Sequence, residues 1–328
     1  MGIAVAGACD AARAAADIIL TQEGLSTIIH GIELAREIFA RLSNFVVYRI
    51  AASMQLLVFF FIAIFAFHPD TYTRPEDVDK EEPWPHYFHM PVLMLMLITL
   101  LNDGTLITIA YDNAKASIHP TRWNLSVLFV SSCLLGTVSC GSSLLLLHFL
   151  LDSWNPSGLF HKLGMPGLYY GQVTTAIYLK ISVSDFLTLF CARTGTHFFW
   201  QIPPATMLLA GTVFSLSLSS LLSILWPLSH PDDIPTEGLQ GEIGTFFFVW
   251  IYCLIFFLLQ DLVKVVVYRW MYRTNFCGIN TTGAVVLPAS TQNFIQELDR
   301  AMTEGEEVVE EEEVVEEESN DKVAKVPV

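Results

Sequence analysis

The chain has 328 residues and a net charge of −16, and 53% of its residues are hydrophobic while only 15% are charged. A soluble globular protein carries about 25% charged residues, so this composition excludes an ordinary soluble enzyme. No basic patch indicates nucleic acid binding, and a membrane protein with several spans is the class that fits.

A short segment of mixed character opens the chain. Gly2–Val5 and Asp17–Leu20 have the pattern of strands, and the alanine-rich stretch Asp10–Ala16 between them has that of a helix. Asp10 suits the start of this helix because a carboxylate is favourable at a helix N-terminus. Such a βαβ piece is too small to bury a core by itself. We expect residues 1–27 to be the end of a larger α/β domain, followed by a stalk helix over 28–44.

Six apolar segments follow, each long enough for a helix that crosses a bilayer, which takes about 20 residues. We place them at Phe45–Phe67, His89–Ile109, Ser126–Leu151, Tyr169–Ala192, Ala205–Trp226 and Gly244–Tyr268. Because backbone polar groups in lipid must be satisfied within the segment, runs of this length predict helices. The predicted fold class is an all-α polytopic membrane protein, with a six-helix transmembrane bundle over residues 45–275 and a short N-terminal α/β stub.

Residues 276–328 differ from the rest in composition. Ten glutamates fall within Glu304–Glu318, around two Val-Val pairs. A segment this charged cannot bury enough apolar surface to fold, so we predict a disordered acidic tail.

The charges in the loops predict the orientation. Basic residues gather before the first span, between the second and third, and after the fourth and sixth, while the alternate loops are acidic; the basic residues are Arg36, Arg41, Lys115, Arg122, Arg193, Arg269 and Arg273. Basic loops stay on the cytoplasmic side. We therefore expect both termini to be cytoplasmic and the loop Asp70–Glu82 to lie outside.

Asp103 is the first candidate for chemistry. A carboxylate at the middle of a bilayer costs about 2.5–3.5 kcal/mol on insertion scales, so an aspartate there indicates function. Gly104 beside it weakens a helix, and Asn102 competes for backbone hydrogen bonds. We expect a broken helix that exposes an ion site at this point. A buried aspartate that only holds the bundle together is the alternative.

Two further spans carry polar candidates. Asp185 lies in the fourth span, five residues after Lys180, and the two are read either as a structural ion pair or as separate groups with a transport role. In the first span, Arg49 is near the cytoplasmic end, where it can extend its head group to the interface. Gln55 is deeper, within reach of a hydrogen bond toward Asp103.

Several stretches resemble plasma-membrane proton-pumping P-type ATPases. They are Gly2–Val5, Asp10–Thr21, Gly24–Thr27, Arg36–Phe39, Asn44–Arg49, Leu101–Thr105, Ile109–Asn113 and Trp123–Leu125. The resemblance is close over residues 2–125 and topological to about residue 275. It implies that the six spans are the last six of ten and that the plasma membrane is the location.

The resemblance also implies roles. Asp103 falls on the aspartate that accepts and donates the proton, and Asp185 falls where fungal pumps have a glutamate implicated in coupling. Gln55 departs from the family, which has a basic side chain there. ATP and Mg²⁺ are implied for a full-length pump, with lipid, the proton and upstream pump domains as partners.

The motifs for phosphoryl transfer are missing from the sequence. It has no DKTGT phosphorylation motif, no TGES loop and no TGDGxND magnesium motif. Since phosphoryl transfer needs the phosphorylated aspartate and its Mg²⁺ site, we expect this chain alone to bind no cofactor and not to hydrolyse ATP. The alternatives are a secondary transporter or channel-like six-helix protein, and a non-catalytic regulatory partner of intact pumps.

Overall fold

The computed structural model describes residues 2–21, 26–72, 84–114 and 124–279. The predicted acidic tail therefore lies almost wholly outside the described residues, as do most of the acidic loop Asp70–Glu82 and the basic residues Lys115 and Arg122.

The N-terminal piece is a small βαβ unit. Strand β1 (Ile3–Ala4) pairs in parallel with β2 (Ile18–Ile19), in the register Ile3 with Ile18 and Ala4 with Ile19, and helix α1 (Asp10–Ala15) connects them. Ala4 and Leu20 are buried, but most apolar side chains of the two strands are exposed. This agrees with the expectation that the unit is too small to bury a core.

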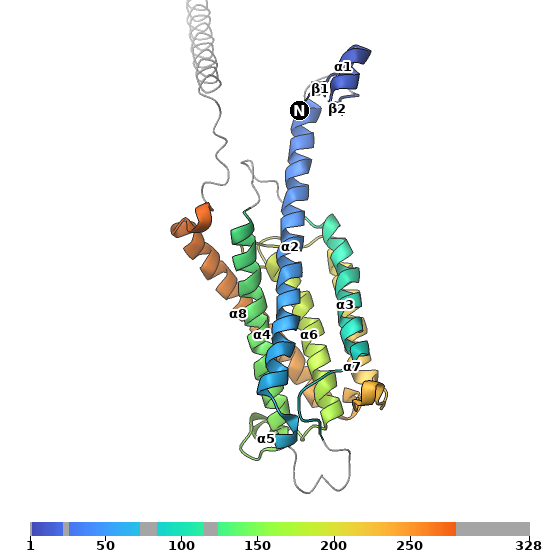
Figure 1. Cartoon of the computed structure of the whole chain (residues 1–328), viewed down its shortest axis with the longest axis vertical. Helices are drawn as coiled ribbons and strands as arrows, with labels where there is room; N and C mark the ends of the chain where they lie inside the picture. The colour runs from blue at the N-terminus through green and yellow to red at the C-terminus, as the bar shows by residue number, and fades with distance from the viewer. Residues whose placement is uncertain (1, 22–25, 73–83, 115–123, 280–328) are drawn as a thin grey trace, which may run out of the picture. The chain divides into compact units, whose positions relative to one another are not determined.

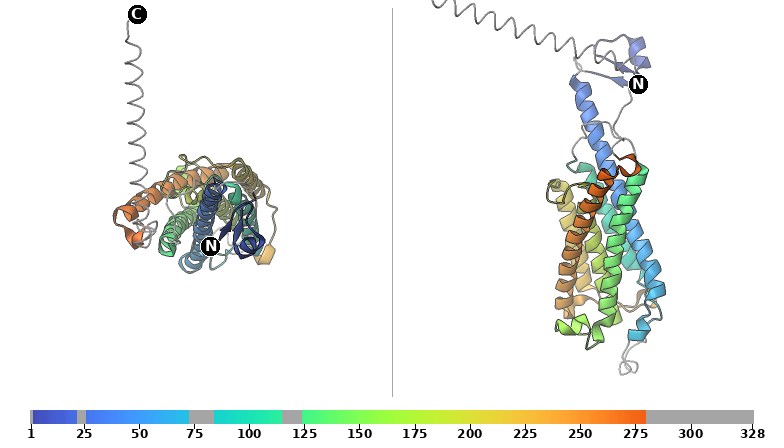
Figure 2. Two further views of the ribbon diagram at one scale, coloured as in Figure 1. Left: turned by 90° about the horizontal axis from the view of Figure 1, so that it is seen from above. Right: turned by 90° about the vertical axis from the view of Figure 1, so that its left-hand side faces the viewer.

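Six helices are long and apolar enough to cross a membrane among the described residues. They are α2 (Ser26–Ala66), α3 (Val92–Ile107), α4 (Leu125–Leu151), α6 (Tyr170–Ala192), α7 (Thr206–Leu225) and α8 (Ile243–Arg273). Figures 1 and 2 show these helices running along a common axis. The predicted fold class is confirmed.

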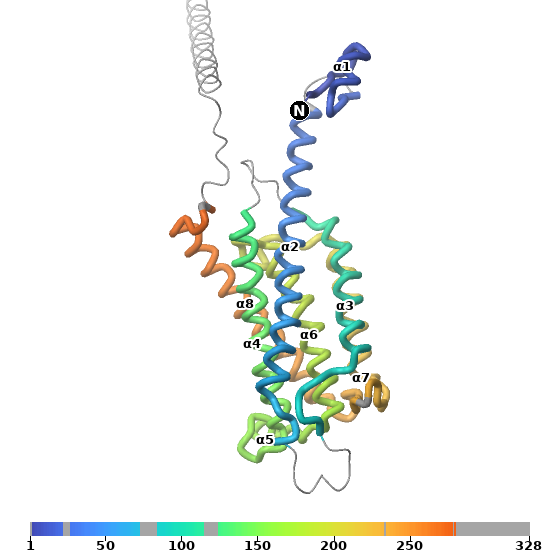
Figure 3. Tube along the Cα trace, viewed as in Figure 1, coloured from blue at the N-terminus to red at the C-terminus, as the bar shows by residue number. Residues whose placement is uncertain are grey.

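Short helical turns join the long helices. They are η1 (Pro69–Tyr72), η2 (Thr108–Tyr111), η3 (Asp152–Trp154), α5 (Leu159–Lys162), η4 (Pro231–Asp233), η5 (Leu239–Gly241) and η6 (Phe276–Gly278). Helix α2 has 41 residues and no interruption, so one continuous helix contains both the predicted stalk and the predicted first span. Its path can be followed in Figure 3.

Helix α6 is the centre of the bundle. It contacts each of the other five long helices, and 89% of its most apolar 18-residue stretch is buried inside the bundle. Its buried residues include a series of polar side chains, among them Thr174, Thr175, Lys180, Ser182, Asp185 and Thr188. Polar groups placed on the most buried helix are shielded from lipid, which is where a membrane protein can hold them.

Small residues bring helices close together at two points. A Cβ atom at Gly136 on α4 would come within 2.9 Å of the carbonyl oxygen of Ala51 on α2, and one at Gly211 on α7 would come within 2.9 Å of the Thr108 side chain. Glycine at these positions allows the helices to approach closely.

The expected break at Gly104 is absent. Helix α3 runs without interruption through Asn102, Asp103 and Gly104 and tightens into the 3₁₀ turn η2 only at Thr108. A single glycine costs a helix about 1 kcal/mol relative to alanine. This cost is smaller than the free energy lost when a break leaves backbone N–H and C=O groups without hydrogen bonds in lipid. The prediction of a broken helix was wrong.

Candidate functional site: a polar line from α2 through α3 to α6

Asp103 is paired with an arginine on the neighbouring helix. Its Oδ1 accepts a hydrogen bond from Nη1 of Arg49, so the pair joins α3 to α2. The side chains are 53% and 45% exposed, which places the pair on the surface of the described bundle. The expected extension of Arg49 to the interface stays a prediction, and the structure adds an ion pair with the candidate carboxylate.

Asn102, the residue before Asp103, points the other way, into the bundle. Its Nδ2 donates to Oδ2 of Asp185 on α6 at 2.7 Å, and both residues are buried. Oδ1 of Asp185 and the side-chain amide oxygen of Asn102 have no hydrogen-bond partner within the described parts of the chain. Of these two adjacent residues on α3, Asp103 places its own carboxylate at the surface, and Asn102 contacts the carboxylate of Asp185 at the centre.

Gln55 is 1% exposed, and its Nε2 has no hydrogen-bond partner among the described residues. The hydrogen bond expected from its amide toward Asp103 is thus not formed, because Arg49 is the residue that contacts that carboxylate. Gln55 remains a buried polar group whose donors are unused.

Lys180 and Asp185 do not form a salt bridge in the structure. Nζ of Lys180 donates to the carbonyl oxygen of Ser139 at 3.0 Å and to Oγ of Ser143, both on α4. Five residues correspond to about 140° beyond a full helical turn, so the two side chains point in different directions from α6. The sequence left a structural pair and separate groups open, and the geometry shows separate groups.

A buried ion pair that the sequence analysis missed ties four elements together. The guanidinium of Arg193, at the end of α6, bonds to both oxygens of Asp112, just after η2, at 2.7 and 2.9 Å. Arg193 also donates to the carbonyl oxygens of Ile202 and Pro203, and the Ala205 backbone nitrogen donates to Asp112. The signal was present as opposite charges at the ends of two apolar runs.

Helix α2 is attached to the same cluster. Nε of Arg41 donates to the carbonyl oxygen of Asp112 at 2.8 Å, and Nδ2 of Asn44 donates to that of Arg193 at 2.9 Å. The half of α2 that precedes the predicted first span is therefore bonded to the ends of α3 and α6, the two helices that contain Asp103 and Asp185.

A second buried pair lies near the end of α8. Lys264 bonds to Asp261 at 2.7 Å and also donates to the Cys191 and His197 carbonyl oxygens and to Thr194 Oγ1. Asp261 in turn accepts from the Phe199 backbone nitrogen. This pair fixes the segment between α6 and α7, which is a structural role.

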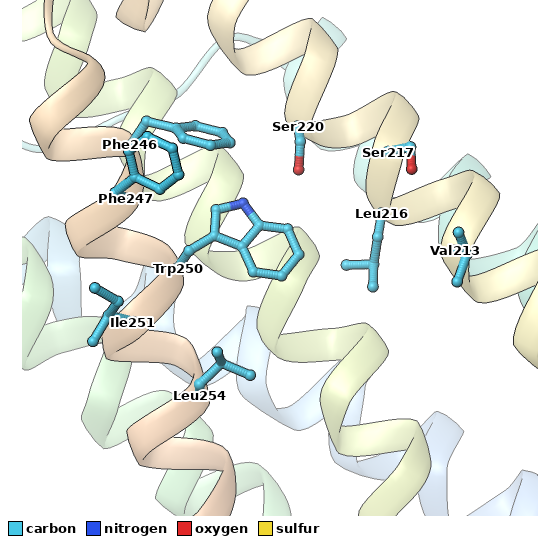
Figure 4. Close-up of a pocket in the computed structure, with 9 residues that line it drawn as sticks. All are labelled: Val213, Leu216, Ser217, Ser220, Phe246, Phe247, Trp250, Ile251 and Leu254. Atoms are coloured by element: carbon cyan, nitrogen blue, oxygen red, sulfur yellow. The ribbon is translucent and has the colours of Figure 1, made fainter.

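The bundle also has an apolar groove away from these charged groups. A groove of about 590 Å³ between α7 and α8 is lined mainly by apolar side chains, with Trp250, Ser217 and Ser220 as its polar exceptions (Figure 4). It lies on helices other than those that contain Asp103 and Asp185. In the portion of the chain that the structure describes, no cluster of three His, Cys, Asp or Glu side chains could hold a metal ion.

Comparison with known proteins gives these helices a context. Probable proton ATPases 1A and 1B of Leishmania donovani are each 46% identical to this chain over 287 residues, which is 85% of its length. A probable plasma membrane ATPase of Dictyostelium discoideum is 29% identical over 277 residues, or 80% of the chain. The two Leishmania homologues of this chain are thus named as probable proton ATPases. The six apolar helices fit the C-terminal transmembrane region of a plasma-membrane P-type ATPase.

The match covers only part of these relatives. The aligned region is 29% of the length of the two Leishmania proteins and 24% of the Dictyostelium protein. No family model matches the chain. The chain is a multi-pass membrane protein that is similar to part of these ATPases.

Proposed function

We propose that this chain is the membrane part of an ATP-driven proton export pump of the plasma membrane, with Asp103 as the proton carrier. The observation that supports this most is the placement of Asp103 in a membrane helix, paired with Arg49, in a chain whose homologues are proton ATPases. In a complete pump, ATP and Mg²⁺ act in domains that lie outside this chain. The chain alone does not hydrolyse ATP.

The proposed mechanism uses the change in surroundings of one carboxylate. In general, a cation in contact with a carboxylate favours its ionised form, and burial away from water favours its protonated form. We propose that Asp103 alternates between contact with Arg49, as in this structure, and a shielded position without it. Alternation between these two states, driven by phosphorylation elsewhere, takes up the proton on one side and releases it on the other.

The bonds around Asp112 and Arg193 supply a mechanical link for this cycle. We propose that residues 1–27 are the end of the phosphorylation domain and that 28–44 form the stalk on the cytoplasmic side. A displacement of the stalk then pulls on Arg41 and Asn44, which are bonded to the ends of α3 and α6. The displacement reaches Asp103 along α3 and Asp185 along α6, and both termini are cytoplasmic in this arrangement.

The test restores the missing domains. The upstream part of a Leishmania relative is fused to this chain, and ATP-dependent acidification of inverted vesicles is measured. Asp103→Asn should reduce proton transport to background, since the amide is nearly isosteric but holds no exchangeable carboxyl proton. Asp185→Asn should reduce it less.

Asp152→Asn is the matched control. This aspartate accepts a bond from Asn155 in the turn after α4, and an asparagine can still accept it, so transport should be unchanged. Proton transport by Asp103→Asn at the parental rate would show that Asp103 is not the carrier.

A further inference from the structure

Lys180 is a buried cation without a contacting carboxylate. The residue is 1% exposed and lies in the middle of α6, the helix that contacts all five others. Its ammonium is held by two neutral oxygens of α4, the Ser139 carbonyl and the Ser143 hydroxyl. No Asp or Glu oxygen lies within salt-bridge distance of Lys180 in the described ranges, whereas Lys264, equally buried, is 2.7 Å from Asp261.

The space beside this lysine is small and lined with further oxygens. A cavity of about 10 Å³, room for about one water molecule, borders Lys180 between α4, α6 and α8. Its polar lining comes from Ser139, Ser142, Ser184 and Gln260. Cys253 on α8 also borders the cavity, and its thiol donates to the backbone carbonyl oxygen of Lys180 at 3.8 Å. The surroundings therefore offer hydroxyl and carbonyl oxygens from three helices and no negative charge in contact.

Such a set of oxygens suits a cation. Hard cations take oxygen ligands, and carbonyl oxygens can replace the hydration shell of a monovalent ion. An ammonium group occupies that position here. Asp185 lies five residues further along the same helix, about 7.5 Å along its axis, and bonds to Asn102 rather than to this ammonium.

We propose that the Lys180 ammonium is a resident cation that fills a monovalent-cation site between α4, α6 and α8. By occupying these oxygens it keeps Na⁺ and K⁺ out of the space between α4, α6 and α8. The meaning for ion selectivity rests on the proposed function, but the occupancy of the site does not.

The experiment measures cation binding to the full chain in lipid nanodiscs, without ATP or a proton gradient. Lys180→Ser removes the ammonium and leaves the oxygens in place. The variant should bind about one ⁸⁶Rb⁺ per chain, and K⁺ should raise its unfolding temperature by about 2–4 °C over the same concentration of choline. The parent chain should show neither effect. A folded Lys180→Ser chain that binds no Rb⁺ and unfolds identically in K⁺, Na⁺ and choline overturns the proposal.

Two variants separate charge from space. Lys180→Met fills the volume without a charge and without new room, and Lys180→Arg keeps the charge, so neither should bind Rb⁺. Rb⁺ binding by Lys180→Arg at the level of Lys180→Ser contradicts the proposal, because a resident charge would then not exclude the ion.

A measurement on the unchanged chain covers the case in which Lys180→Ser does not fold. The ¹⁵N resonance of the Lys180 side chain, assigned by its loss in Lys180→Arg, should have the shift of an ammonium group at pH 7. A neutral amine at that pH overturns the proposal. Because no step requires pumping, failure of these tests is distinct from failure of Asp103 as the carrier.

Discussion

The charged groups at the ends of α3 and α6 differ from those halfway along α6 in how their hydrogen bonds are filled. Asp112 and Arg193 share two bonds and reach three more backbone groups between them, and α2 is bonded to their carbonyl oxygens. Asp185 has one bond and an unpartnered oxygen, and Lys180 has two bonds to neutral groups. Both sets are almost fully buried.

This difference indicates which buried groups hold the helices in place and which are candidates for proton chemistry. A buried ion pair with every donor and acceptor satisfied is costly to disturb and holds its elements in one arrangement. A buried carboxylate with an unbonded oxygen is not held by such a set of bonds, so its protonation state can change when a neighbouring group moves. Helix α6 contains both kinds of group, with the fully bonded Arg193 at its end and the incompletely bonded Asp185 within it. Measurements of stability can test whether the two kinds of group differ as their bonding indicates.

Removal of one partner of the fully bonded pair should have the largest effect. Asp112→Ala leaves the buried Arg193 guanidinium without its carboxylate, so we expect the free energy of unfolding to fall by about 3–5 kcal/mol. Equilibrium unfolding of the chain in detergent micelles measures this. The double change Asp112→Ala with Arg193→Met leaves no unpaired charge and should be more stable than the single one. A single variant as stable as the double would refute the role given to this pair.

The two buried lysines provide a direct comparison. Lys264→Met leaves Asp261 charged and without its ammonium, so we expect a loss of about 3–5 kcal/mol. Lys180→Met removes one bond from the Ser139 carbonyl and one from the Ser143 hydroxyl, both of which keep bonds within α4, so we expect about 1–3 kcal/mol. The same unfolding measurement on both variants gives the order. A larger loss for Lys180→Met than for Lys264→Met would mean that Lys180 is a structural lock.

A partly exposed pair on α2 should give the smallest effect. Glu37 and Arg41 are one turn apart, 3.1 Å between Oε2 and Nη2, with side chains 34% and 24% exposed. Pairs of this kind contribute about 0.3–0.5 kcal/mol, so Glu37→Gln should change the unfolding free energy by no more than that. Arg41 keeps its bond to the Asp112 carbonyl in this variant. A loss of more than about 1 kcal/mol would show that this part of α2 is coupled to the cluster through Glu37 itself.

The sequence by itself determined the six spans and the βαβ piece, and it predicted Asp103 and Asp185 as candidate functional residues, which stay predictions. These conclusions depend on local properties: the length of an apolar run sets whether a helix can cross a bilayer, and a carboxylate within such a run is costly wherever its partners lie. The strand pattern at Gly2–Val5 and Asp17–Leu20 was similarly local, and the paired strands lie within those limits.

Only the tertiary structure decided which charges meet. Asp112 and Arg193 are 81 residues apart, and nothing in a single sequence states that the ends of α3 and α6 are neighbours. Lys180 and Asp185 are close in sequence yet bond to different helices, because the turn of α6 directs their side chains apart. Arg49 contacts Asp103 and Gln55 does not, because the arrangement of α2 and α3 in the bundle places the arginine, and not the glutamine, beside that carboxylate. Hydropathy and spacing describe one helix at a time, whereas pairing depends on the arrangement of several.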